Sequence, residues 1–566
     1  MADARAGPAL GYLRGLGCAA VLGVLGAVAA QGFRAALEFA SHLLFHSADD
    51  ISQVFAALPW YARLLVPTLG GALAACVLIL AQRRERKAGV VSEYLEVIDG
   101  RVARVPVGAS LLRCLSSFFS IASGGSIGKE GAMVQLAATL ASMLGAPLRH
   151  LRGEDFRLGI AMAATGGLAA VYHTPLAAAI FIAEIAFGGI EPRRIGFLFT
   201  AAVASAWYVS ATGHYAPLYA LPAYAFDVTG SAMLAVAAVA VLAGGMGSVF
   251  LLAIQGARRF FTWLHASLLA RMMAGGLVVG VITLVAPEVA GNGFAPVAHL
   301  LEGGGFAAPL LLLLVLKVLA TAATVGSGGI GGLFTPSLMI GALTGAACGP
   351  LVAHGMDMGG SVALLTVAGM AAALAATTQA PLMSMLMVFE MTQEPSFIFP
   401  LMLATVLAYA TSMLLGHPGT YDVIARHRAR FERRTHLTDA TAADAMCPAD
   451  PTVPASACVA EAWQVGVKQK KRFVFVVDGS GRFRGAVWTQ DLGARTAAGQ
   501  GDEALDGLMV DAFPVVFASD RLVDVWQTVV ESPAERTPVL ADRRTRQLVG
   551  VLRKSDLLRQ AGQLFA

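Results

Sequence analysis

The 566-residue sequence is 56% hydrophobic and only 14% charged, whereas charged residues make up roughly a quarter of a typical soluble domain. The charge is unevenly spread, because residues 425–566 hold 37 of the 78 Lys, Arg, Asp and Glu side chains. This distribution excludes a uniformly soluble protein and predicts an apolar body followed by a soluble tail. The net charge of +4 is small and gives no indication of a nucleic-acid partner.

The body contains apolar runs of mixed length, some shorter and some longer than the ~20 residues that a bilayer span needs. The clearest runs are 15–30, 64–81, 159–187, 232–254, 310–323, 362–389 and 397–415. Their unequal lengths and internal glycines and prolines predict tilted, broken or paired helices. By the positive-inside rule, the basic clusters at residues 83–87 and 426–434 predict that these loops and the tail are cytoplasmic.

A glycine-rich stretch of the body, residues 124–135, carries the ionisable pair Lys129 and Glu130. An ionisable residue inside a membrane segment is costly, and it is therefore a functional candidate by default. The alternative is a Lys–Glu pair that reaches out to the membrane interface. Lys129 on its own is expected to be structural or to attract anions, rather than to be a ligand of a transported ion.

Two landmarks of the body repeat in the same order. Glu184 stands nine positions after a Pro-Leu pair, and Glu390 stands nine positions after a second one, at an offset of 206 residues. The stretch SGGSIGKEGA at 123–132 resembles SGGIGGLFTP at 327–336, at an offset of 204. These matches predict a duplicated unit. In membrane transporters such repeats place the substrate site near the midplane, where broken helices meet.

Both glycine-rich stretches lead into an apolar helix. The first N–H groups of a helix lack partners inside it, and the N-terminus carries about half a positive charge. Two such N-termini directed at one point would bind a small anion and still let it leave. Ionised Glu130 would compete with that anion and close the path, whereas its protonated form could swing away. We therefore predict a small-anion site near the middle of the membrane.

Three motifs, in order, resemble those of the CLC family of chloride channels and chloride/proton exchangers. Gly128-Lys129-Glu130-Gly131 looks like the GKEGP motif of the family, and Gly332-Leu333-Phe334-Thr335-Pro336 looks like its GxFxP motif. Tyr421, which stands 31 residues after Glu390, is similar to the family's pore tyrosine. The resemblance covers about residues 60–430, and the tail also resembles the end of CLC proteins.

The resemblance implies an α-helical polytopic membrane protein with a CLC-type inverted repeat of tilted and partial helices. It implies a homodimer with one pore per subunit and Glu130 as the external gate. The backbone amides of Leu333 and Phe334 would hold chloride, and the neutral hydroxyl of Tyr421 would donate to it from the cytoplasmic side. The full implied anion-binding set is Gly128, Lys129, Glu130, Gly131, Leu333, Phe334 and Tyr421.

The sequence departs from the family at the start of the pore. Counted back from Glu130 without a gap, Gly89 stands where the family has a serine whose hydroxyl contacts the ion. Preference for chloride over other small anions such as nitrate is therefore open. Ala132 replaces the usual proline after Gly131, and we expect it to start the helix less firmly than proline would.

A second departure concerns proton coupling. Ile185 stands where exchangers of the family commonly have an internal glutamate that takes protons from the cytoplasm. Glu184 is one position earlier and points about 100° away on a helix, so it cannot simply substitute. We favour a channel-like chloride pathway with Glu130 as a gate that responds to pH or voltage. The alternative is a chloride/proton antiporter with a non-standard internal proton path.

The predicted organisation is a transmembrane anion-transport domain at residues 1–430 and a soluble α+β module at residues 431–566. Within the module, residues 443–494 and 508–560 look like two copies of one unit. Each copy has an apolar helix, a short strand, a charged turn, a second strand and a helix start that contains an acid. This pattern resembles a tandem CBS pair, which is common at the end of CLC proteins.

Tandem CBS pairs often bind adenine nucleotides, and Asp491 and Asp556 stand where an acid often contacts the ribose. The Ser or Thr that usually precedes this acid by three residues is Trp488 in one copy and Arg553 in the other. A structural or dimerising role of the module is therefore favoured over nucleotide binding.

Other classes of protein fit less well. An intramembrane enzyme needs a nucleophile with a base, or a metal cluster, and the body has no HExxH motif and no cluster of acids and histidines; His173 stands isolated near Pro175. A CBS-regulated cation transporter would need several carboxylates around its ion. We expect no enzyme activity, metal or cofactor. We expect a multi-pass protein of a bacterial inner membrane that moves chloride or other small anions, and protons if it is an exchanger.

Overall fold

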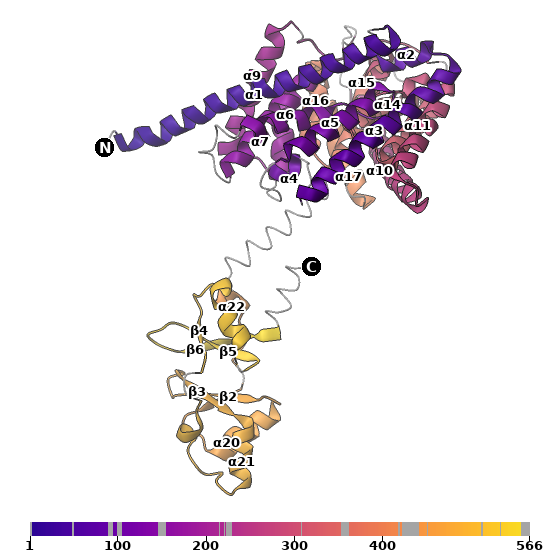
Figure 1. The fold of residues 1–566 in the computed structure, drawn as a ribbon. Coiled ribbons are helices and arrows are strands. Elements are labelled where there is room, and N and C mark those ends of the chain that lie inside the picture. Colours follow the sequence, from indigo (N-terminus) through magenta and orange to yellow (C-terminus); the bar gives the residue numbers. More distant parts are fainter. Residues whose placement is uncertain are drawn as a thin grey trace. The chain divides into compact units, whose positions relative to one another are not determined.

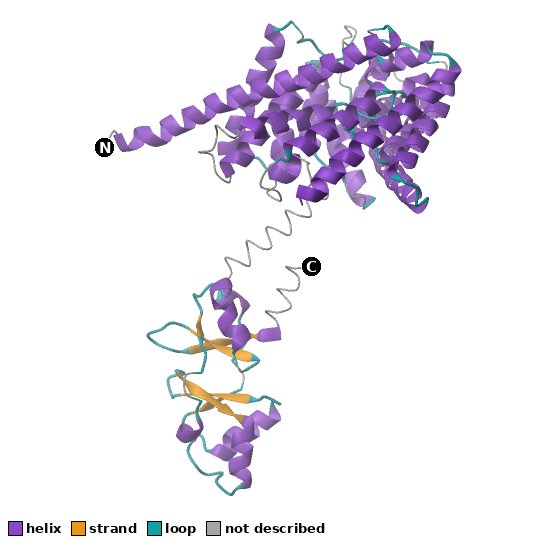
Figure 2. Cartoon of the chain, in the orientation of Figure 1, coloured by secondary structure: helices purple, strands orange, loops and turns teal. Residues whose placement is uncertain are grey.

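The computed structural model describes most of the chain. The described residues are 3–47, 50–88, 94–98, 105–144, 154–213, 215–219, 221, 229–306, 308–352, 361–416, 419–420, 441–449, 451–510, 513–532 and 534–555. The chain forms two compact units, Met1–Ala425 and Arg426–Ala566. The first unit is built of helices, and the second contains two small sheets with short helices (Figure 1, Figure 2).

The helices of the first unit divide into two series. The first series is α1 (Asp3–Phe45), α2 (Ile51–Ala57), α3 (Trp60–Ala88), α4 (Tyr94–Ile98), α5 (Val107–Ala122), α6 (Glu130–Leu144), α7 (Glu154–Tyr172), α8 (Pro175–Phe181), the π-helical η1 (Ile182–Phe187) and α9 (Pro192–Ala211). The second series is α10 (Gly230–Trp263), α11 (Leu268–Val285), η2 (Pro287–Val289), α12 (Phe294–Leu301), α13 (Leu310–Ser327), α14 (Phe334–Val352), α15 (Ser361–Thr378), α16 (Pro381–Thr392), η3 (Pro395–Phe397) and α17 (Ile398–Leu414).

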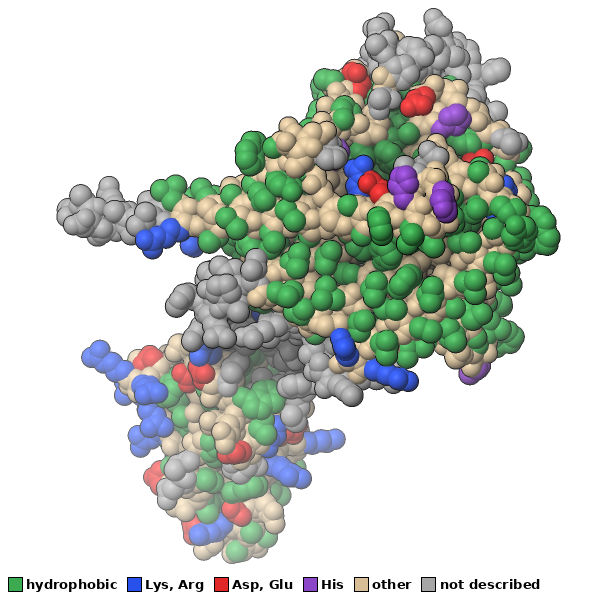
Figure 3. All heavy atoms as spheres, turned by 45° about the horizontal axis from the view of Figure 1, so that its top comes forward, with side chains coloured by type: hydrophobic (Ala, Val, Ile, Leu, Met, Phe, Trp, Pro, Cys, Tyr) green, Lys and Arg blue, Asp and Glu red, His purple; other side chains and the backbone are tan. Residues whose placement is uncertain are grey.

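Long and partial helices are mixed, as the unequal apolar runs predict. Among the described residues, seven helices are long and apolar enough to cross a membrane. Others, such as α8 with 7 residues and α16 with 12, are much shorter than the ~20 residues of a span. The outer surface of this unit presents a broad band of hydrophobic side chains (Figure 3). The prediction of a polytopic helical membrane protein is confirmed.

The two longest apolar runs of the sequence are each broken at the same point. The residues directly after α7 and α15 are His173 and Gln379, whose left-handed φ angles are 55° and 61°. Two residues later, Pro175 and Pro381 begin α8 and α16 at the first helical position, which proline favours. The backbone thus repeats its breaks at the offset of 206 residues that the sequence predicts.

The two series are related by the predicted repeat. The helices from α5 to α9 correspond in order to those from α13 to α17, and α6 and α14 begin at Glu130 and Phe334. Just before these starts, Gly128 and Gly332 form an antiparallel bridge. Gly128 and Gly332 are equivalent positions of the two repeats, and an antiparallel pair of equivalent residues is related by a local two-fold axis. The bridge therefore agrees with an inverted repeat.

The second unit contains two copies of one α+β arrangement. In the first copy, β1 (Thr452–Pro454) pairs parallel with β2 (Phe473–Val477), which pairs antiparallel with β3 (Phe483–Trp488). In the second copy, β4 (Val516–Phe517), β5 (Arg536–Leu540) and β6 (Leu548–Arg553) pair in the same way. The register shifts near the end of β2 and again near the end of β5.

Helices complete each copy of the tail. The first has α20 (Val459–Lys468), α21 (Thr489–Ala497) and η4 (Leu505–Leu508), and the second has α19 (Ala442–Ala445) and α22 (Leu522–Glu531). One buried cluster takes residues from both sheets, including Phe475, Phe483, Leu540 and Val551. The two copies therefore share a core, and the α+β fold predicted for the tail is confirmed.

Candidate functional site

The starts of helices α6 and α14 meet at the bridge between the two repeats. The Gly128 amide donates to the Gly332 carbonyl at 2.8 Å, and the Gly332 amide donates to the Gly128 carbonyl at 2.9 Å. The helix that follows each glycine begins two residues later. Two helix N-termini, each with the partial positive charge of its first amides, therefore converge on one buried point, as the glycine-rich motifs predict.

The carboxylate of Glu130 occupies this point. Its Oε1 accepts from the Thr335 amide at 3.1 Å, and its Oε2 accepts from the Thr335 hydroxyl at 3.4 Å. The Glu130 side chain begins on α6 and ends at the first turn of α14, where only 1% of the residue is exposed. A buried carboxylate at a helix N-terminus stands in the place that a bound anion would take.

Gly128 and Gly332 make room for this carboxylate. A Cβ on Gly128 would lie 2.1 Å from Oε1 of Glu130, and a Cβ on Gly332 would lie 2.5 Å from its Cδ. Any side chain at either position would therefore displace the carboxylate or the backbone. Gly131, the other glycine of the motif, is less restricted, because its Cβ would lie 3.2 Å from the Gly332 nitrogen.

Leu333 and Phe334 lie at the start of α14. Leu333 packs against the main hydrophobic core, and Phe334 is buried. The Phe334 ring meets the rings of Tyr172 and Phe181 edge to face, at centroid distances of 6.3 Å and 5.3 Å. The side chains at this start are thus apolar, and polar contacts to an anion would come from the backbone and from the neighbouring Thr335.

A cavity of about 570 Å³ leads to Glu130. Lys129 is partly buried and lines this cavity together with the Arg34–Glu38 ion pair of α1, whose atoms are 2.8 Å apart. Charged and histidine side chains gather on the face of the first unit that Figure 3 presents. Lys129 and Glu130 therefore line the same cavity, in which a positive charge favours the approach of anions.

Tyr172 and Thr335 were not predicted as site residues. The Tyr172 hydroxyl lies 2.9 Å from the Thr335 hydroxyl, and both side chains are buried. Thr335 stands inside the GLFTP motif, which is a signal that could have identified it. No sequence pattern marks Tyr172, because its contact joins residues 163 positions apart. The neighbouring His173 donates from Nδ1 to the Ala216 carbonyl at 2.8 Å, and its ring stacks on Tyr215.

The position at which exchangers of the family have an internal glutamate is apolar and buried in this chain. Ile185 lies on η1 and is 8% exposed. The adjacent Glu184 turns its carboxylate to the start of α16, where Oε2 accepts from the Met383 amide at 2.9 Å. Glu390 does the reverse, because its oxygens accept from the Leu176 and Ala177 amides of α8 at 3.0 Å and 2.8 Å. The two repeated acids therefore cap each other's repeat.

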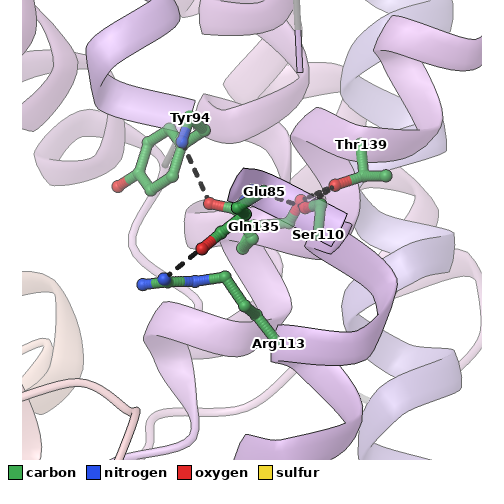
Figure 4. A network of polar contacts seen from close by, with 6 residues as sticks. All are labelled: Glu85, Tyr94, Ser110, Arg113, Gln135 and Thr139. Carbon is green, nitrogen blue, oxygen red and sulfur yellow. Dashed lines mark hydrogen bonds and ion pairs between the residues drawn. The ribbon is translucent and has the colours of Figure 1, made fainter. Parts of the chain in front are cut away.

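A buried polar network joins α6 to α4, the first described element after Gly89 (Figure 4). The Gln135 side chain accepts from the Tyr94 amide at 3.0 Å and donates to the Ser110 hydroxyl at 2.6 Å. Ser110 in turn lies 2.6 Å from the Thr139 hydroxyl. Nearby, an Arg113 nitrogen is 3.5 Å from a carboxylate oxygen of Glu85. The helix that begins at Glu130 is thus tied to α4.

Three predicted site residues, Gly89, Tyr421 and Asp556, lie outside the described residues. In the tail, Asp491 is exposed on the first turn of α21. Trp488 packs on Phe473 with a centroid distance of 4.0 Å. The position that usually supplies a hydroxyl to a nucleotide is therefore occupied by a packed ring.

Similar proteins support an assignment to a family. A family model described as voltage gated chloride channel matches residues 70–413. A ClcB-like chloride channel protein of Ralstonia nicotianae is 39% identical over 419 residues, which are 73% of this chain and 97% of that protein. The voltage-gated ClC-type chloride channel ClcB of Salmonella typhi is 35% identical over 419 residues, which are 71% of this chain and 97% of that one.

Solved structures match the fold. A slow cyanobacterial Cl⁻/H⁺ antiporter matches with a TM-score of 0.63 and 24% identity over 74% of this chain and 98% of that chain. A eukaryotic CLC transporter matches with a TM-score of 0.58 and 17% identity over 96% and 98%. The residues matched by the family model include the converging helix starts and Glu130. The chain belongs to the CLC family of voltage-gated chloride channels and transporters, whose members move anions across membranes and are not enzymes.

Proposed function

We propose that the protein conducts chloride through a channel-like pathway that Glu130 closes. The observation that carries this proposal is the position of the Glu130 carboxylate between the starts of α6 and α14. An ionised carboxylate and chloride compete for the same amide donors, so the path is closed while the carboxylate is bound. Protonation or a change of voltage releases the side chain and leaves the donors for the anion.

Three observations support a channel over an exchanger. Ile185, at the position of the family's internal glutamate, offers no group that can carry a proton. Glu184 is engaged with the Met383 amide, so its carboxylate is directed to α16. The relatives that share 35% of their residues with this chain are also described as channels. Proton-coupled exchange is the alternative, with protons that reach Glu130 by a route without this glutamate.

The test uses purified protein in liposomes that hold a chloride gradient. Chloride efflux and external pH are recorded together, while valinomycin and potassium set the voltage. Glu130→Ala is compared with the wild type, and Glu302→Ala, which changes an exposed carboxylate after α12, is the matched control. We expect chloride efflux without linked proton movement, and faster efflux in Glu130→Ala than in either other protein.

Two results would contradict the proposal in different ways. Proton movement against its gradient, driven by chloride, would make the protein an antiporter despite Ile185. A lack of chloride flux in all three proteins would exclude the chloride pathway altogether. A nitrate flux under the same conditions would show whether the pathway is restricted to chloride.

The proposal also covers the setting of the protein. It is a homodimer in a bacterial inner membrane, with one pathway in each subunit and the tail in the cytoplasm. The basic cluster that begins at Arg83 supports the cytoplasmic side for the loop after α3. The tail acts as a structural or dimerising CBS pair, because the packed Trp488 does not favour a nucleotide.

A further inference from the structure

The hydroxyl groups of Thr335 and Tyr172 form a short hydrogen-bonded chain that ends at the gate. The Thr335 hydroxyl is 3.4 Å from Oε2 of Glu130, and the Tyr172 hydroxyl is 2.9 Å from the Thr335 hydroxyl. The three residues are 2%, 5% and 1% exposed, so water does not compete for these contacts. The sequence lacks the family's serine hydroxyl, because Gly89 stands at that position.

The direction of this chain follows from counting hydrogens. A threonine hydroxyl has one hydrogen, and an ionised carboxylate only accepts. With Thr335 as the donor to Glu130, its oxygen accepts the hydrogen of Tyr172, whose hydroxyl also lies within hydrogen-bond reach of the Glu130 carboxylate. Each donor polarises the next one, so the last O–H is a stronger donor than an isolated threonine would be.

The geometry suits an acceptor larger than oxygen. The contact of 3.4 Å between Thr335 and Glu130 is longer than the ~2.7–2.8 Å that is usual between two oxygens. Chloride has a larger radius than a carboxylate oxygen and accepts hydrogen bonds at longer distances. The Tyr172 ring is held against Phe334, which fixes the position of its hydroxyl.

We propose that Thr335, oriented by Tyr172, is the side-chain donor that determines which anion binds once Glu130 withdraws. This inference rests on the proposed chloride pathway and adds a specificity-determining pair to it. When the carboxylate leaves, the Thr335 amide and hydroxyl both point to a buried space without an acceptor, and such buried donors are costly to leave unpaired. An anion that accepts from both replaces the carboxylate.

The pair favours chloride over nitrate. Chloride has the more concentrated charge and loses more hydration energy when it enters a pore. A site selects chloride only if its donors compensate for that larger loss. Removal of one neutral hydroxyl donor therefore weakens the binding of chloride more than that of nitrate, and the selectivity of the pathway shifts toward nitrate.

The test measures the ratio of nitrate to chloride flux in liposomes that contain the full-length protein. Thr335→Val removes the hydroxyl and keeps the shape, Thr335→Ser keeps a hydroxyl, and Tyr172→Phe removes the supporting donor but keeps the ring. Thr344→Val is the control, because its hydroxyl bonds to the Ile340 carbonyl within α14. We expect the ratio to rise on the order of threefold in Thr335→Val, and less in Tyr172→Phe.

The Thr335→Ser variant separates a role of the hydroxyl in anion selectivity from a role of the side chain in packing. Thr335→Ser and Thr344→Val are expected to keep the wild-type ratio, whereas a packing defect would lower both fluxes together. An unchanged ratio in both Thr335→Val and Tyr172→Phe would overturn the inference while the chloride pathway stands. If Thr335→Val does not fold, an unchanged ratio in Tyr172→Phe alone overturns it. No chloride flux in the wild type would overturn the proposed function and this inference with it.

Discussion

The Glu130 carboxylate occupies the position that a bound anion would take between the starts of α6 and α14. Its carboxylate accepts from the amide and hydroxyl of Thr335 and lies beside Gly128, where no side chain stands. In the proposed mechanism the same donors serve the carboxylate and the permeating anion, so closing and conduction exclude each other.

A methyl group added at Gly128 tests whether the Glu130 carboxylate competes with the anion. In Gly128→Ala the new Cβ would lie 2.1 Å from Oε1 of Glu130, and the flexible glutamate side chain is the group that can move away. We expect chloride efflux at neutral pH several-fold above the wild type, with a weaker response to acid. Efflux from liposomes between pH 4.5 and 7.5 measures both effects.

The control for this variant is Gly245→Ala on α10, because a Cβ there would meet nothing within 4 Å. The wild type is expected to conduct more as the pH falls, since protonation removes the negative charge that competes with chloride. Efflux of Gly128→Ala below the wild type at every pH would contradict the displacement of the carboxylate.

At this scale the sequence predicts part of the site. Glu130 could be predicted, because an ionisable residue in an apolar glycine-rich stretch is unusual on its own. The contact of Glu130 with Thr335 could not, because it joins residues 205 positions apart and depends on the angle at which two helix starts meet. Tyr172 could not be predicted either, because its hydroxyl contact with Thr335 joins residues 163 positions apart.

At the scale of elements, each repeat supplies a glutamate whose carboxylate caps the start of a helix in the other repeat. The Glu390 carboxylate closes the start of α8, and the Glu184 carboxylate closes the start of α16. The sequence predicts the repeat and the helix starts at Pro175 and Pro381, because these are local patterns. It does not predict that each acid serves the opposite helix, since the partners are about 200 positions away.

We expect Glu390→Gln to lower the free energy of unfolding by about 1 kcal/mol, because a neutral amide is a weaker acceptor for the two free amides of α8. Glu184→Gln should act in the same direction at α16. Thermal unfolding of the detergent-solubilised protein measures both. Glu302→Gln is the control, since Glu302 is exposed at the end of α12. A wild-type midpoint for both variants would contradict a capping role of the two carboxylates.

The turns after β2 and β5 in the tail share one arrangement, in which an aspartate carboxylate accepts hydrogen bonds from the residues that follow it. Asp478 follows β2, and hydrogen bonds from the Ser480 hydroxyl and the Arg482 and Ser480 amides hold its pKa below the ordinary value of 3.8. Asp542 follows β5, and hydrogen bonds from the hydroxyl and amide of Thr545 and from the Arg544 amide lower its pKa in the same way.

A lowered pKa in the folded tail gives a defined pH dependence. The stabilisation is fully present above the unfolded value near 3.8 and is lost as the pH falls through the lower folded value. The double variant Asp478→Asn with Asp542→Asn should therefore lose less stability between pH 5 and pH 3 than the wild type. Thermal unfolding of the tail followed by circular dichroism measures this difference. An equal loss in the two proteins, with the exposed Asp502→Asn as control, would argue against it.

At the scale of the whole molecule, the site and its access lie within the first unit. The described atoms around Glu130 and all residues that line its cavity belong to Met1–Ala425. The bacterial relatives are matched over 97% of their own length by less than three quarters of this chain. More than a quarter of this chain therefore lies outside the match to these relatives.

A chain that ends after residue 440 should therefore still conduct chloride. The two compact units have separate cores, and the core residues of the tail come from the tail alone. We expect the shortened protein to fold, to show chloride efflux in liposomes and to keep its dependence on Glu130, while its response to pH or voltage is free to differ. Glu130→Ala in the shortened chain is the control for a leak that does not pass through the site. Loss of efflux in a shortened protein that still unfolds cooperatively would make the tail a required part of the pathway, because its removal would then have closed a pore whose described residues are all present.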